Sequence, residues 1–155
     1  MLSLLNAALL TDLIVIALSF NVLQTPALTL WYREFGLGAV IADVLILVLG
    51  VLMASFIYPY MFSEYNLLYF IGVVLMVQVL HDLLFGFFVN RYRGKSRIFQ
   101  VLQQYVQEIG PRILLVDASM MVSTVLLHHV FTRSSHNDVW TVVLVYVVPY
   151  LVYSV

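Results

Sequence analysis

Long apolar segments separated by short polar links restrict the fold of this chain more than any other feature. Their length matches the roughly 20 residues that an α-helix needs to cross a bilayer. Of the 155 residues, 63% are hydrophobic and only 10% are charged, whereas about a quarter of the residues in a soluble domain are charged. We therefore predict a single all-α domain, a polytopic transmembrane helix bundle of four to five spans. The spans are expected at about residues 2–22, 37–60, 67–89, 109–131 and 138–155.

Prolines mark the ends and the weak points of these segments. Pro26 follows the first segment and is read as its stop signal. Pro111 lies in the first turn of the fourth, where its missing N–H costs little. Pro149 interrupts the short fifth segment, which we expect to tilt, kink or insert incompletely. The first segment contains Asp12 and follows no basic residue, which argues against a cleaved signal peptide.

A basic link between the third and fourth segments sets the expected orientation. It is followed at about 96–108 by apolar residues at helical spacing that alternate with glutamines, which predicts an amphipathic helix lying at the membrane interface. Basic residues concentrate on the cytoplasmic side of membrane proteins. Placing the link there puts six of the seven basic residues on that side, with the N-terminus out and the C-terminus in. The six are Arg33, Arg91, Arg93, Lys95, Arg97 and Arg112, against Arg133 alone.

Ionisable residues occur inside the apolar segments and form a layer at one depth. Counting about 1.5 Å per residue from the predicted inner ends places four aspartates about 9 to 15 Å deep, each on a different span. Charged side chains at this depth cost about 2.5–3.5 kcal/mol each on insertion scales, so they are expected to face the interior of the bundle. The predicted intramembrane polar layer consists of Asp12, Asp43, Gln78, His81, Asp82, Arg112 and Asp117.

Three interpretations of this layer are open at the level of sequence. It can hold the helices together, with Arg112 and His81 pairing with the acids. It can conduct protons or other cations, as Asp and His side chains do in pumps and channels. It can also hold a metal ion in an intramembrane enzyme through its histidine and three of its aspartates, Asp43, Asp82 and Asp117. Against the last, adjacent residues such as His81 and Asp82 point about 100° apart on a helix.

Two further groups have simpler interpretations. Trp31, Tyr32 and Arg33 are typical of an anchor at the inner interface, with rings at the level of the lipid headgroups. His128 and His129 lie near the outer end of the fourth segment and indicate a hydrated interfacial pair, not a metal site.

Most other function classes find no support in the sequence. The chain contains no recognised hydrolase, protease or nucleotide-binding motif, so we predict no enzyme, no catalytic residue, no metal and no other cofactor. A net charge of -1 provides no basic surface for nucleic acid.

Three blocks of the sequence resemble a known family. They are residues 31–46 (WYREFGLGAVIADVLI), residues 78–85 (QVLHDLLF), and the stretch 105–121 with its glutamate, glycine, aspartate and paired methionines. They are similar to recurring blocks of uncharacterised multi-pass membrane proteins encoded by large double-stranded DNA viruses of algae and protists. In that family a Pro-Gly-Asn type of link follows the third span, whereas residues 91–95 here read RYRGK.

The resemblance implies a setting and transfers no chemistry. Such viruses enclose a lipid membrane beneath an icosahedral capsid. We therefore expect an integral protein of the viral inner membrane, or of a host membrane, with a structural or assembly role. Its expected partners are the lipid bilayer, further copies of itself in a homo-oligomer, and capsid proteins. A small proton or cation channel or transporter is the alternative, and an intramembrane metal-dependent enzyme is the third possibility.

Overall fold

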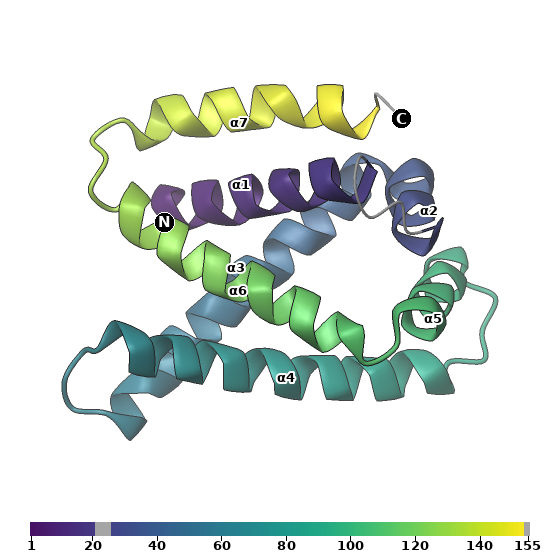
Figure 1. The fold of residues 1–155 in the computed structure, drawn as a ribbon, viewed down its shortest axis with the longest axis horizontal. Coiled ribbons are helices and arrows are strands. Elements are labelled where there is room, and N and C mark those ends of the chain that lie inside the picture. Colours follow the sequence, from purple (N-terminus) through teal and green to yellow (C-terminus); the bar gives the residue numbers. More distant parts are fainter. Residues whose placement is uncertain (21–25, 154–155) are drawn as a thin grey trace.

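The computed structural model describes residues 1–20 and 26–153, so the predicted ends of the first and fifth spans, 21–22 and 154–155, lie outside the described residues. The described chain forms seven α-helices and no β-strand, which confirms the all-α prediction. The helices are α1 (Leu2–Leu18), α2 (Pro26–Phe35), α3 (Leu37–Met61), α4 (Leu67–Arg91), α5 (Arg97–Ile109), α6 (Arg112–Phe131) and α7 (Asn137–Val152). In Figure 1, α7, α1 and α4 run along the long axis, α3 and α6 cross obliquely between α1 and α4, and the short α2 and α5 lie together at one end.

Three helices, α3, α4 and α6, are long and apolar enough to cross a membrane. They give the chain the character of a membrane protein that its composition predicts. Helices α1 and α7 are also apolar but have 17 and 16 residues. At 1.5 Å per residue they are about 24 to 26 Å long, slightly less than the roughly 30 Å of a bilayer hydrocarbon core. The predicted number of four to five spans therefore depends on these two helices.

Two glycines with positive φ separate the short helices α2 and α5 from the long helices α3 and α6 that follow them. Gly36, with φ of +50°, lies between α2 and α3, and Gly110, with φ of +57°, lies between α5 and α6. Side chains with a Cβ rarely adopt such backbone angles. The fourth span, predicted from about residue 109, corresponds to α6, which begins at Arg112, after the break at Gly110 and after Pro111.

Helix α2 is absent from the sequence-based prediction. In that prediction Pro26 only ends the first span, whereas in the structure it is the first residue of α2. A proline at the start of a helix loses no hydrogen bond, and its fixed φ suits the first turn. The same residue type can therefore stop one helix and start the next.

Helix α1 is the centre of the packing and lies between α7 and α6 in Figure 1. Its small residues Ala7 and Ala8 are fully buried, as expected where helices approach closely in a membrane. Polar side chains join α1 to both neighbours. Asn6 donates through Nδ2 to the Asn137 carbonyl oxygen of α7 at 2.8 Å. Thr124 of α6 donates to the Thr11 hydroxyl at 3.2 Å.

A tight hairpin links α3 to α4 (Figure 1). The Tyr58 hydroxyl donates to the Glu64 carbonyl oxygen at 2.9 Å and accepts from the Asn66 backbone N–H at 2.8 Å. The Asn66 side chain in turn caps the first turn of α4 by accepting from the Leu68 N–H. These bonds fix the relative positions of two of the long helices.

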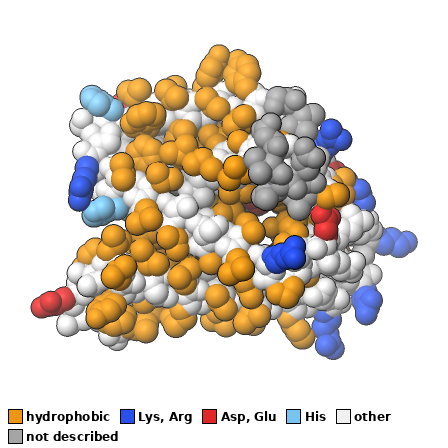
Figure 2. Space-filling model, viewed as in Figure 1, with side chains coloured by type: hydrophobic (Ala, Val, Ile, Leu, Met, Phe, Trp, Pro, Cys, Tyr) orange, Lys and Arg blue, Asp and Glu red, His pale blue; other side chains and the backbone are white. Residues whose placement is uncertain are grey.

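The two ends of the bundle differ in charge. Figure 2 shows that most Lys and Arg side chains gather at the end that contains α2 and α5, while hydrophobic side chains cover most of the remaining visible face. The chain thus has a basic end, and the predicted polar layer lies on the helices that lead away from it.

Candidate functional site: an acidic cavity beneath α5

A cavity of about 680 Å³ lies among α2, α3, α4, α5 and α6, towards the basic end of the bundle, and Val15 of α1 also lines it. Five polar residues of the predicted layer line it, contributed by three different helices. They are Asp43 of α3, Gln78, His81 and Asp82 of α4, and Asp117 of α6. Counted from the observed helix ends nearest α2 and α5, the aspartates lie about 8 to 14 Å into the bundle. The structure thus brings together side chains that are far apart in the sequence.

Asp43 is held by two aromatic donors from α2. Trp31 donates through Nε1 to Asp43 Oδ2 at 3.1 Å, and the Tyr32 hydroxyl lies 2.9 Å from the same oxygen. The Tyr32 hydroxyl also lies 3.0 Å from Oδ1 of Asp12, which is fully buried on α1. Tyr32 therefore connects two carboxyl groups, one on each side of it.

Tyr32 cannot donate a hydrogen bond to both Asp12 and Asp43 at the same time. A phenol has one proton to donate, but the Tyr32 oxygen lies within hydrogen-bond distance of both carboxyl groups. Both contacts are favourable only when one of the carboxyl groups carries a proton and donates it to Tyr32. The geometry is that of a short proton-sharing chain across α1, α2 and α3.

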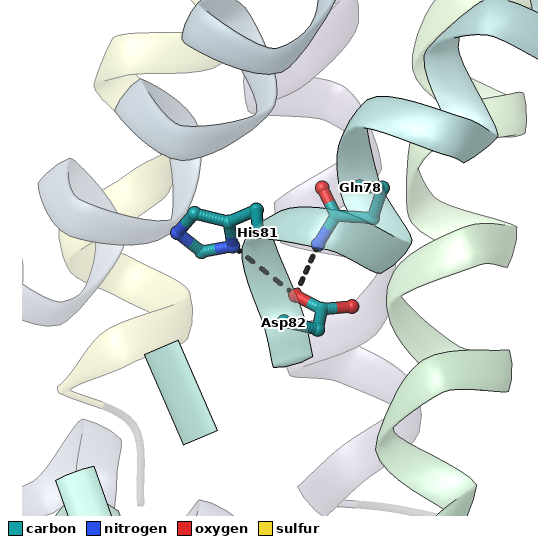
Figure 3. Close-up of polar contacts among 3 residues, drawn as sticks. All are labelled: Gln78, His81 and Asp82. Atoms are coloured by element: carbon teal, nitrogen blue, oxygen red, sulfur yellow. Dashed lines mark hydrogen bonds and ion pairs between the residues drawn. The ribbon is translucent and has the colours of Figure 1, made fainter. Parts of the chain in front are cut away.

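Asp82 makes its hydrogen bonds within its own helix. As Figure 3 shows, Gln78 Nε2 and His81 Nδ1 both approach Asp82 Oδ1, at 2.6 Å and 3.2 Å. The other oxygen, Oδ2, points away from both residues, is buried and has no hydrogen-bond partner. The Asp82 side chain is only 8% exposed, so a carboxyl group with a free acceptor atom lies at the wall of the cavity. These bonds do not join one helix to another.

Asp117 contributes a third carboxyl group from α6. No hydrogen bond or ion pair to its side chain is present among residues 1–20 and 26–153. The phenol of Tyr105, on α5, lines the same cavity. Burial and then the charges of Asp117, Asp43 and Asp82 raise the pKa of Tyr105 well above its usual value, so this phenol remains a proton donor.

Helix α5 covers the cavity with its apolar face. Ile98, Phe99, Leu102, Tyr105 and Val106 all line the cavity, and they are the residues whose spacing predicts the amphipathic helix. The glutamines of α5 alternate with them, and Gln100, Gln104 and Gln107 are exposed. The amphipathic pattern therefore describes a helix whose apolar side faces a cavity.

Polar contacts at both ends attach α5 to α2. Arg97, at the start of α5, forms a bidentate ion pair with Glu34 near the end of α2. At the other end, Glu108 accepts from the Ala27 N–H at 2.9 Å. The hydrogen bond from Arg97 lowers the pKa of Glu34, so this pair is intact at neutral pH and is lost only as the pH falls below the usual range for glutamate.

Two predictions about the layer and its anchor are wrong in the structure. Arg112 is exposed and makes no ion pair within the described residues, so it does not neutralise the acids. Trp31 and Tyr32 are 7% and 2% exposed and face Asp43; they do not anchor the chain in lipid headgroups. Only Arg33 is exposed as an anchor requires. The reason is that α2 is a helix that turns its aromatic side inward.

The described residues do not form a metal-ligand set. Within the described ranges, no three His, Asp or Glu side chains are close enough to hold one metal ion. At the opposite end of the bundle, His129 and His136 are exposed, and His128 is half-buried beside a second cavity of about 530 Å³. His129 Nε2 lies 3.0 Å from Arg133 Nη2. A neutral histidine accepts a hydrogen bond in this arrangement.

Comparison of the chain with protein-family models, with curated proteins and with solved structures gives no match. The site therefore has to be interpreted from its own geometry.

Replacing Tyr32 with Phe tests the connection between the two carboxyl groups. The change keeps the ring but removes the group that contacts Asp12 and Asp43, and an unsatisfied buried polar group costs about 1–3 kcal/mol. We expect a loss of stability of that size in reversible unfolding of the protein in mixed micelles. Tyr60→Phe is the matched control, because Tyr60 is 79% exposed. Equal stabilities of the two variants would contradict the assignment.

Proposed function

We propose that this chain is an integral membrane protein that binds cations, including protons, in the acidic cavity and moves them across the bilayer. The observation that supports this proposal is the set of three carboxyl groups around one cavity, from α3, α4 and α6, with no Lys or Arg among the described residues that line it. Buried negative charge without a partner is costly in an apolar environment. A proton or another cation relieves that cost.

The hydrogen-bonded groups at the cavity fit a role in proton movement. The chain from Asp12 through Tyr32 to Asp43 leads from the middle of α1 to the cavity. On the other side of the cavity, His81 and Asp82 form a second pair of titratable groups. Asp and His side chains placed in this way inside membrane proteins are typical of proton relays.

We also propose that α1 and α7 cross the bilayer, so that the bundle has five spans with the N-terminus out and the C-terminus in. Membranes thin locally around helices that are slightly short. The basic end of the bundle, at α2 and α5, is then cytoplasmic. The cavity lies in the cytoplasmic half of the membrane in this orientation.

An assembly role in the inner membrane of a virus is the second candidate, and it rests on the resemblance of the three sequence blocks. The feature that suits it is the outer surface of α7, where Trp140, Tyr146 and Tyr150 are exposed. Exposed aromatic side chains suit contact with lipid headgroups or with another protein chain in the membrane. An assembly role is compatible with cation movement, since it concerns where the protein lies and what it contacts, whereas cation movement concerns the cavity.

Cation movement is tested with the purified chain in liposomes that contain a pH-sensitive dye and carry an imposed potential. We expect proton flux above that of empty vesicles, and its loss in Asp43→Asn and Asp117→Asn, because each change removes a titratable group from the cavity. Asp138→Asn is the control, since Asp138 is exposed in the first turn of α7 at the opposite end. Flux that is absent in the wild type, or equal in all variants, would contradict the proposal.

Orientation can be tested by single-cysteine labelling, because the sequence contains no cysteine. Lys95→Cys and Ser135→Cys place a thiol in the α4–α5 and α6–α7 links, both at exposed positions. We expect an impermeant maleimide applied outside intact cells to label position 135 and not position 95. Labelling of position 95 in intact cells, or of both positions, would show that the orientation or the number of spans is different.

The assembly role is tested by mass spectrometry of purified virions of the source virus. We expect this chain among the particle proteins, and its loss when detergent removes the inner membrane. Detection only in infected-cell membranes would refute the virion role and leave the cation proposal unaffected.

A further inference from the structure

The acidic cavity is much larger than a proton or a metal ion requires. Its volume of about 680 Å³ lies within the roughly 300–1,000 Å³ of pockets that hold small organic molecules. Six helices, α1 to α6, contribute to its wall, and α5 covers it with its apolar face. The cavity volume alone therefore indicates a ligand of the size of a small organic molecule.

The lining combines three kinds of groups. Carboxyl groups come from Asp43, Asp82 and Asp117, and most of the remaining wall is aliphatic. The aromatic rings of Trp31, Tyr32, Phe85, Phe99 and Tyr105 are also part of it. Aromatic faces attract organic cations, and the attraction is strongest where water is excluded. Carboxyl groups together with aromatic and aliphatic walls match a molecule that is both positively charged and apolar.

Other ligand classes fit less well. An anion would lie against three carboxyl groups with no Lys or Arg in the described lining to oppose them. A metal ion would find no group of three closely placed ligands among the described residues. A neutral lipid would leave the buried Oδ2 of Asp82 without a partner, as it is now. A molecule with a positively charged group and an apolar body can contact the carboxyl groups, the aromatic rings and the aliphatic wall at once.

From this lining we propose that the cavity binds a lipophilic organic cation, with its charged centre among Asp43, Asp82 and Asp117 and its hydrocarbon body against the apolar face of α5. The inference rests on the proposed function in one respect, the use of the cavity as a cation site, and it names the class of cation.

The test uses the full chain in lipid nanodiscs and radiolabelled tetraphenylphosphonium as the probe. We expect saturable binding above that of empty nanodiscs, with about one site per chain. Triphenylphosphine oxide has a similar apolar body without the charge, and we expect it not to compete. Asp82→Asn and Asp117→Asn should weaken binding by about tenfold or more, since each removes a charge facing the probe. Asp138→Asn should bind as the wild type does.

Each result decides the inference. Competition by the neutral analogue, binding no greater than in empty nanodiscs, or equal binding by all folded variants would overturn it. If the aspartate variants do not fold, the comparison of charged and neutral compounds on the wild type still decides. Proton flux in liposomes without probe binding would refute the organic-cation site and leave the proposed function intact. If neither probe binding nor proton flux is observed, both the organic-cation site and the proposed transport function are refuted. Probe binding without any flux would support the site and refute the transport function.

Discussion

Negative charge inside an apolar bundle is the constraint on which the rest of this structure depends. Each carboxyl group within the helices requires a hydrogen-bond donor, a proton or a cation, because the surroundings cannot solvate it. The fold supplies donors to Asp12 and Asp43 through the aromatic side of α2, and to Asp82 through its own helix. Asp117 receives none within the described residues. Hydrogen bonds therefore satisfy part of the charge, and the remainder faces a cavity.

The two short helices determine how this charge is arranged. Helix α2 has little contact with lipid through Trp31 and Tyr32, since both side chains are buried against the acids. Helix α5 is attached to α2 at both ends and presents its apolar side to the cavity. Without these helices the cavity that the carboxyl groups of α3, α4 and α6 line would lose the walls that α2 and α5 supply. The positive-φ glycines at 36 and 110 make both turns possible.

The sequence predicts well how far along its helix a polar side chain lies, and poorly which side of the helix it faces. A count of residues from the ends of the apolar segments places four aspartates in one layer, and Asp43, Asp82 and Asp117 do line one cavity. The same count cannot separate Asp12, which lies behind Tyr32, from the other three. Arg112 is close in depth to the layer but faces outward, because a shift of one residue rotates a side chain by about 100°. The roles of Trp31, Tyr32 and Tyr105 depend on contacts across the bundle that no local pattern contains.

The hydrogen bonds of α1 have a consequence for the order of assembly in the membrane. Asn6 finds its partners on α7, 131 and 135 residues further along the chain, and Thr11 finds its partner on α6. During synthesis, α1 is therefore made with polar groups that lack their final partners until α6 and α7 follow. Helix α1 reaches its native packing only after α7 has been made. Contacts between helices that are far apart in the sequence therefore complete the environment of α1 late in folding.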